Sequence, residues 1–139
     1  MASIDRPFVV DASVSAAWLL PDEATAATEA ALDATATQAA WVPALWLLEI
    51  GNLLLSAQRR KRIDTGQRLA LAAAAAALRL QVDREAVAIG ALDALAARHG
   101  LTTYDAAYLE LALRRGLPLA TRDSGLKTAM AAAGVQLVF

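Results

Sequence analysis

The stretch Pro7-Phe8-Val9-Val10-Asp11-Ala12-Ser13 decides the fold. Its apolar, partly β-branched run predicts a short buried strand that ends at Asp11. Ser13 then begins a short helix, which Pro21 stops because proline cannot continue a helix. A buried strand that leads directly into a helix is typical of α/β proteins with parallel sheets.

The same alternation continues along the chain. We expect further strands at about 41–43, 80–82, 117–121 and 135–139, and further helices at about 22–37, 44–59, 65–77, 84–99, 102–115 and 124–133. Because one or two helices separate successive strands, hairpins are not expected and the strands should run mostly parallel. The sequence therefore predicts one domain over residues 1–139, an α/β three-layer sandwich with a mostly parallel central sheet and helices on both faces.

Composition excludes several classes of protein. The longest apolar run, 69–78, is flanked by arginines and is shorter than the roughly 20 residues that span a bilayer, so we expect no membrane segment. The first residues lack the basic start and apolar core of a secretory signal. The absence of cysteine excludes disulfides, thiolate catalysis and cysteine-based zinc sites. These features together favour a cytoplasmic protein. A net charge of −1 argues against nucleic-acid binding through bulk charge alone.

Carboxylates follow two of the expected strands. Asp11 ends the first strand, and Asp123 comes just after the fourth. Ligands of open parallel sheets bind outside the carboxyl ends of the strands, so both side chains should face the same edge. Asp105 lies near the start of another expected helix. Glu49 lies within an apolar helix that we expect to be largely buried, and a buried carboxylate needs a partner.

Each of these acids also has a structural explanation. Asp11 and Asp123 could be helix N-caps, Asp105 has the spacing of a capping box with Thr102, and Glu49 could belong to an ion pair. A cluster of all four would instead hold unfavourable negative charge, which bound cations would relieve. Oxygen ligands without histidine or cysteine select Mg²⁺ or Mn²⁺, and water on such an ion can attack a phosphodiester.

Three further residues are candidates for supporting roles. Ser13 and Thr121 each lie two positions from one of the acids, where a hydroxyl could hydrogen-bond a carboxylate or a metal-bound water. Ser13 could equally serve only as a helix-start residue. Arg122 is a candidate for contact with an RNA phosphate. His99 is the only histidine and lies at the end of an expected helix, and cysteine is absent, so we do not expect a nucleophile–base triad.

Four segments, in this order, resemble the PIN-domain nucleases and, more narrowly, the VapC-type toxins of bacterial toxin–antitoxin pairs. They are VVDAS at 9–13, EIGNLL at 49–54, YDAAYLELA at 104–112 and LATRDSGL at 119–126. The resemblance implies an Mg²⁺- or Mn²⁺-dependent endoribonuclease that cuts single-stranded or loop regions of RNA. It also implies a homodimer held inactive by a cognate antitoxin. The family's acidic quartet falls on Asp11, Glu49, Asp105 and Asp123, and its accessory polar positions fall on Ser13 and Thr121.

Three other interpretations remain. The chain could be a PIN nuclease that is not a toxin, or a PIN-shaped module that binds protein or RNA without catalysis. The intact quartet argues against the second of these. A phospho-acceptor domain of the receiver type also has acids at strand ends. It needs an adjacent acidic pair after the first strand, whereas Asp11 is followed by Ala12, and a lysine near the last strand, whereas Lys127 lies in mid-helix.

Overall fold

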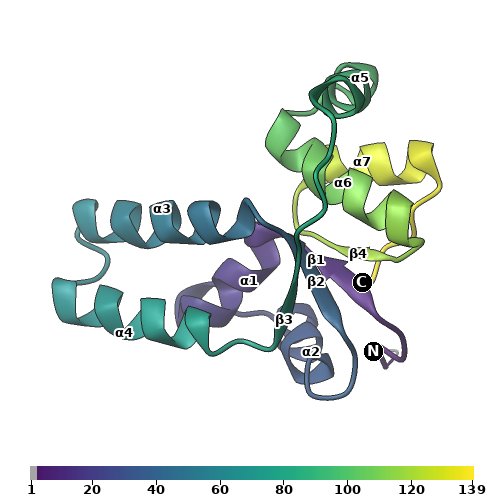
Figure 1. Ribbon diagram of the computed structural model, residues 1–139. Coiled ribbons are helices and arrows are strands. Elements are labelled where there is room, and N and C mark those ends of the chain that lie inside the picture. Colours follow the sequence, from purple (N-terminus) through teal and green to yellow (C-terminus); the bar gives the residue numbers. More distant parts are fainter. Residues whose placement is uncertain (1–2) are drawn as a thin grey trace.

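The computed structural model describes residues 3–139 and shows helices on both sides of a small central sheet (Figure 1). In chain order the elements are β1 (Phe8–Val10), α1 (Ala12–Leu19), the 3₁₀ helix η1 (Pro21–Glu23), α2 (Ala26–Ala34), β2 (Ala40–Pro43), α3 (Trp46–Arg59), α4 (Thr65–Ala76), β3 (Leu80–Asp83), α5 (Ile89–His99), α6 (Thr103–Arg115), β4 (Leu119–Ala120) and α7 (Ser124–Ala133). The predicted α/β class is confirmed.

The four strands form one parallel sheet in the order β3-β2-β1-β4. From β1 the chain builds the sheet first through β2 and β3 on one side, and later returns to add β4 on the other. Val9 lies opposite Trp41 in β2 and opposite Leu119 in β4. The strand order therefore reverses between β1 and β4, and the carboxyl ends of these strands are where a ligand is expected.

Side chains of β1 alternate between two separate cores, as the pleat of a strand requires. Phe8 and Val10 belong to a core built with α1, α2 and α3, whereas Val9 belongs to a core built with α6 and α7. All three of these side chains are fully buried. Alternate side chains of β1 therefore pack against the helices on opposite faces of the sheet. The predicted three-layer arrangement is confirmed.

The predicted strand at 135–139 is wrong. The segment makes only one isolated parallel bridge, in which Leu137 lies opposite Leu119. The backbone N–H of Leu119 donates to Gln136 O at 3.0 Å, and that of Val138 donates to Leu119 O at 3.2 Å. Strand β4 is only two residues long, so the segment beside it pairs with one residue and does not form a longer ladder.

Two predicted helices begin at different places. The segment 22–37 is not one helix but η1 followed by α2, because Thr25 caps α2. The Thr25 hydroxyl accepts from the N–H of Thr28 at 3.1 Å, and the Thr28 hydroxyl accepts from the N–H of Thr25 at 2.9 Å. The helix predicted from residue 84 begins only at Ile89, and the preceding residues run as loop beside α6, where Glu85 pairs with Arg114.

Helix α3 is less buried than its sequence suggests. Together with α4 it forms an antiparallel pair that extends away from the sheet (Figure 1). The side of α3 that carries Leu47, Leu48 and Leu55 is exposed, and no residue of α4 is fully buried. The expectation that α3 is largely buried is therefore wrong. Among the described residues, no helix has the length and apolarity needed to cross a membrane.

Candidate active site

The four predicted carboxylates each stand at the start of a different helix. Asp11 and Asp123 are the N-caps of α1 and α7, and Glu49 and Asp105 lie in the first turns of α3 and α6. Helix N-termini carry partial positive charge and leave backbone N–H groups without helical partners, so they favour anions. The carboxyl edge of the sheet thus collects carboxylates together with the helix ends that stabilise negative charge.

Asp11 is buried, and both of its oxygens accept hydrogen bonds. Oδ1 accepts from the Ser13 hydroxyl at 2.6 Å and from the N–H of Val14 at 3.2 Å, while Oδ2 accepts from the Thr121 hydroxyl at 2.5 Å. Burial raises the pKa of Asp11 above its usual value, and these hydrogen bonds partly oppose the rise because they favour the charged form. Ser13 and Thr121 therefore hold the carboxylate in one orientation from two different segments.

Asp123 lies at the surface of the same edge. Its Oδ2 accepts from the N–H of Leu126 at 2.7 Å, and its own N–H donates to the Thr121 hydroxyl at 3.0 Å. Thr121 therefore contacts both Asp11 and Asp123. The capping role considered from the sequence is present for both aspartates, and it fixes where their side chains stand.

Glu49 is half-buried, and its hydrogen-bond partner is a tyrosine rather than a lysine or an arginine. The hydroxyl of Tyr108, a buried residue of α6, donates to Glu49 Oε1 at 2.6 Å. Burial raises the pKa of Glu49, the Tyr108 hydrogen bond lowers it, and the charges of Asp105 and Asp11 raise it further. Among residues 3–139, Glu49 forms no ion pair with a lysine or an arginine.

The Asp105 carboxylate has less hydrogen-bond support than the others, which comes from the Thr102 side chain alone. Thr102 accepts from the N–H of Asp105 at 3.1 Å, but Asp105 does not complete a capping box. Burial raises the pKa of Asp105, the charges of Asp123 and Asp11 add to the rise, and the hydrogen bond with the Thr102 side chain opposes it. The carboxylates that influence Glu49 and Asp105 thus come from positions 11 to 123 of the chain and lie near one another at this edge.

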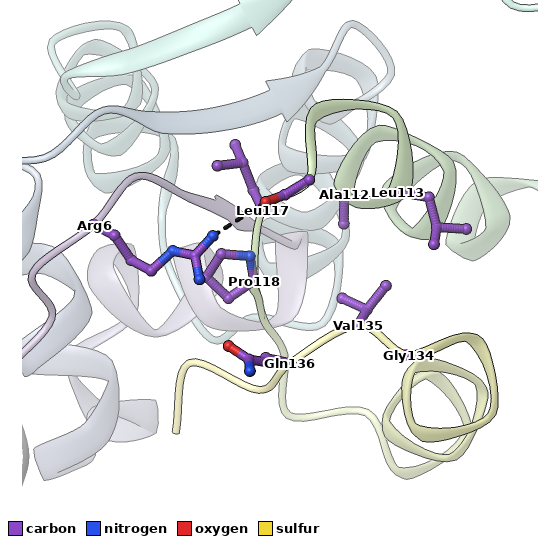
Figure 2. A pocket seen from close by; sticks show the side chains of 9 residues that line it. Arg6, Ala112, Leu113, Leu117, Pro118, Gly134, Val135 and Gln136 are labelled. Atoms are coloured by element: carbon purple, nitrogen blue, oxygen red, sulfur yellow. Dashed lines mark hydrogen bonds between the residues drawn. The ribbon is translucent and has the colours of Figure 1, made fainter.

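A pocket of about 310 Å³ lies at the opposite edge of the sheet, where the strands begin (Figure 2). Its lining includes Pro118, just before β4, and Arg6, just before β1. The Arg6 guanidinium donates to Gly116 O at 3.1 Å. This pocket lacks carboxylates and is separated from Asp11 by the length of β1, so it is not part of the candidate site.

Comparison with known proteins identifies the fold family. The family model for the PIN domain matches residues 8–130, which is most of the chain. The chain belongs to the PIN-domain family. PIN domains are a family of nucleases, and this family generally uses divalent metal ions. No curated protein matched the chain in a separate comparison.

Solved structures show the same fold. The crystal structure of PAE2754 from Pyrobaculum aerophilum is 24% identical, with a TM-score of 0.61 over 91% of this chain and 87% of that one. A toxin–antitoxin complex from Klebsiella pneumoniae is 18% identical, with a TM-score of 0.57 over 95% of this chain and 98% of that one. At these identities the likeness shows the fold alone.

The residues of this PIN domain fit a hard divalent cation in chemistry and charge. The donor set is entirely oxygen. Burial raises the pKa values of Asp11, Glu49 and Asp105, and neighbouring carboxylates raise those of Glu49 and Asp105 further. Within residues 3–139, however, no three such side chains converge tightly enough to form a ready-made metal cage. The site has the donors and the charge for a cation, in a more open arrangement.

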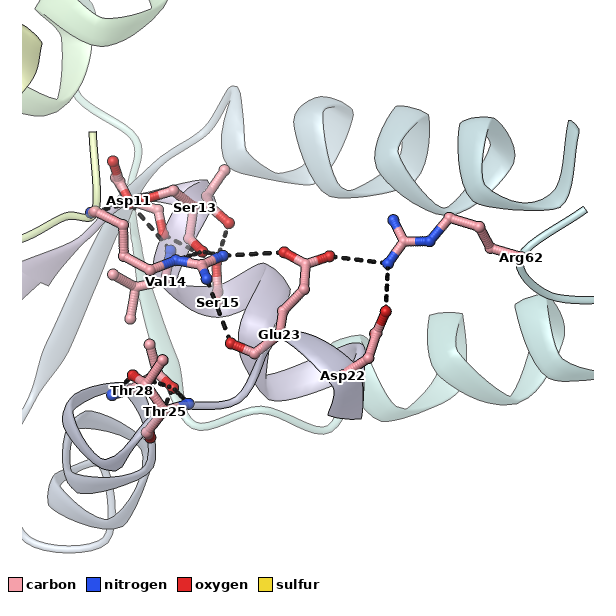
Figure 3. A network of polar contacts seen from close by, with 11 residues as sticks. Asp11, Ser13, Val14, Ser15, Asp22, Glu23, Thr25, Thr28 and Arg62 are labelled. Carbon is pink, nitrogen blue, oxygen red and sulfur yellow. Dashed lines mark hydrogen bonds and ion pairs between the residues drawn. The ribbon is translucent and has the colours of Figure 1, made fainter. Parts of the chain in front are cut away.

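Arg122 has structural contacts that its position in the sequence did not reveal. Its Nε donates to Ser13 O at 2.8 Å, Nη1 donates to Glu23 O at 3.3 Å, and Nη2 pairs with Glu23 Oε1 at 3.0 Å. Glu23 in turn pairs with Arg62, as does Asp22 (Figure 3). The guanidinium of Arg122 thus ties the loop after β4 to α1 and η1. Contact with an RNA phosphate stays a prediction, and these occupied donors weaken it.

Tyr108 is a candidate site residue that the sequence analysis did not single out. It lies three positions after Asp105 on the same helix, a spacing that places the two side chains on one face. That spacing was the available signal, but the partner of Tyr108 is Glu49, 59 positions earlier in the chain. Only the tertiary structure brings these two residues together.

Proposed function

We propose that this PIN domain is an Mg²⁺- or Mn²⁺-dependent endoribonuclease. The observation that carries the proposal is the placement of Asp11, Glu49, Asp105 and Asp123 at the starts of four helices, with Thr121 joining Asp11 to Asp123 and with Asp105 and Glu49 near the charge of Asp11. Among residues 3–139, none of the four forms an ion pair with a lysine or an arginine. A carboxylate cluster of this kind stores unfavourable charge that a purely structural role does not explain. It suits chemistry on a phosphodiester, which brings its own negative charge together with cations.

Asp11, Asp105 and Asp123 would hold the cation, and Glu49 would complete the site directly or through a water. When bound, such an ion lowers the pKa of its water and neutralises charge on a phosphate. The chain itself supplies the starts of four helices, which favour an anionic phosphodiester at this edge. Ser13 and Thr121 support the charged form of Asp11, and Tyr108 does the same for Glu49.

We further propose that the domain is the toxin of a toxin–antitoxin pair and acts in the cytoplasm. Its substrate is RNA, its protein partner is a cognate antitoxin, and it forms a homodimer. The resemblance of four sequence segments to VapC-type toxins supports this assignment, as does the likeness in fold to a toxin–antitoxin complex. The exposed leucines of α3, Leu47 and Leu55, are consistent with a protein partner because large apolar side chains are left in water without one.

Metal dependence tests the proposed activity. The purified protein should cut a single-stranded RNA in the presence of Mg²⁺ or Mn²⁺. Excess EDTA should abolish the cleavage, and added Mn²⁺ should restore it, because in the proposed mechanism the bound ion lowers the pKa of the attacking water. Gel analysis of a labelled RNA measures each step. Full activity in EDTA would reject the mechanism, and no cleavage with either ion would reject the function.

One observation favours a second candidate function, a PIN-shaped module that binds RNA or protein without cutting. This observation is that the described residues contain no ready-made metal cage. The same assay separates the two functions, because a binding module retains a labelled RNA uncut whether Mg²⁺, Mn²⁺ or EDTA is present.

A further inference from the structure

A second pocket, of about 390 Å³, opens beside the carboxylates. It is lined by Leu45, Leu48, Glu49, Asn52 and Tyr104, and we call it the Tyr104 pocket. Leu48 and Asn52 are separated by four positions on α3 and therefore lie on one face of that helix. Tyr104 faces them from the first turn of α6. The pocket thus joins the starts of the two helices that carry Glu49 and Asp105.

The pocket exposes large apolar side chains at the rim of a charged site. Tyr104 is 64% exposed and Leu48 is 73% exposed, although each lies directly next to one of the four carboxylates in the sequence. The lining has no lysine or arginine. A phosphate is therefore a poor occupant of the pocket itself, whereas a neutral, flat and partly polar group is a good one.

The lining combines the contacts that recognise a nucleobase. An exposed aromatic ring stacks on the face of a base, an aliphatic side chain covers apolar surface, and an amide donates to and accepts from the polar base edge. Glu49 belongs to both the pocket and the carboxylate site. A strand with its phosphate at the carboxylates would therefore bring a neighbouring base to Tyr104.

We propose that the Tyr104 pocket binds an unpaired nucleobase next to the phosphate that is cut, with the base stacked on Tyr104 and its polar edge at Asn52. The inference rests on the proposed ribonuclease function and adds a site that selects single-stranded substrate. Bases inside a duplex are stacked on both faces, so only an unpaired base offers a free face to the ring.

A binding titration tests the pocket independently of cleavage. A short single-stranded RNA carries one 2-aminopurine, whose fluorescence falls when it stacks, and it is titrated with protein in EDTA and in Mg²⁺. Cleavage products are resolved in the same samples. Tyr104→Ala should remove the quenching and weaken binding by about 5- to 100-fold, the range expected for one stacked base. Tyr104→Phe should retain both, because the ring remains. Leu113→Ala, which truncates another exposed apolar residue of α6, is the control and should match wild type.

The outcomes separate this inference from the proposed function. Quenching that depends on Tyr104 without any cleavage would support the pocket and reject the ribonuclease. Cleavage and binding that are unchanged in Tyr104→Ala would overturn the pocket and leave the ribonuclease standing. If Tyr104→Ala instead converts a dimer to a monomer in gel filtration, without loss of RNA affinity, the pocket is an interface with a second copy and the inference is wrong.

Discussion

Asp11→Asn should reduce metal-dependent RNA cleavage by roughly 100- to 10 000-fold, the range for a group that supports the reacting water. The variant removes the charge of the most buried carboxylate in the site. It keeps the shape and the hydrogen bonds, because an asparagine can still cap α1 and a threonine hydroxyl can accept as well as donate. Thermal unfolding should therefore change little, and the loss should appear in kcat.

Asp64→Asn is the matched control for this variant. Asp64 caps α4, with its Oδ1 accepting from the N–H of Gln67 at 2.7 Å, and it belongs to none of the carboxylate contacts at the edge of the sheet. The substitution removes the same charge from the same kind of cap and should leave cleavage at the wild-type rate. A folded Asp11→Asn protein with cleavage within about threefold of wild type would contradict the assignment of Asp11.

Asp83→Asn should lower the free energy of unfolding by about 2 to 3 kcal/mol, because one substitution breaks two ion pairs of a buried carboxylate. Asp83 ends β3, and its side chain is only 5% exposed. Its oxygens pair with Arg114 at 2.7 Å and with Arg115 at 2.9 Å. These contacts fasten the edge strand to the end of α6. Urea unfolding of the metal-free protein measures the loss.

The pH dependence of this effect has a definite sign. The two guanidinium groups hold the pKa of Asp83 below its usual range, chiefly through the hydrogen bonds from Arg114. A carboxylate with a lowered pKa stabilises the folded state fully above its unfolded value of about 3.9, and this contribution is lost as the pH falls through the folded pKa. The difference between wild type and Asp83→Asn should be constant near neutral pH and shrink below about pH 4.

Glu85→Gln is the control for the ion-pair network. Glu85 also pairs with Arg114, at 3.1 Å, but its side chain is 65% exposed. Exposed pairs contribute about 0 to 1 kcal/mol, so this variant should lie close to wild type. Equal losses in the two variants would show that burial of Asp83 does not decide the effect. An Asp83→Asn loss that is as large at pH 3 as at pH 7 would show that the charge of Asp83 does not cause it.

Much of the fold could be predicted because its signals are local. The apolar run before Asp11 and the proline after α1 specify a strand and a helix without reference to the rest of the chain. The predictions were wrong where the structure of a segment depends on the residues that pair with it. Residues 135–139 have the composition of a strand but lie beside a β4 of two residues, and the break before α2 depends on a reciprocal pair of threonines rather than on the usual acidic capping residue.

Part of the candidate site could also be predicted from local sequence. Parallel strands place their carboxyl ends at one edge, so Asp11 and Asp123 could be expected near each other from their positions after strands. The contacts that hold these carboxylates and the loop after β4 in place could not be predicted from the sequence. Tyr108 reaches Glu49 across 59 positions, and Arg122 reaches Ser13 across 109. Such pairs depend on how helices pack on the two faces, which no local pattern specifies.

The central claim is that carboxylates distant in sequence hold a hard divalent cation at the carboxyl edge of the sheet. Anomalous diffraction from crystals soaked in Mn²⁺ tests it most directly. The account predicts a strong peak among Asp11, Asp105 and Asp123, at metal–oxygen distances of about 2.0 to 2.2 Å, with Glu49 beside it. An ion bound elsewhere in an active protein, with Glu49 and Asp105 turned away from Asp11, would contradict it.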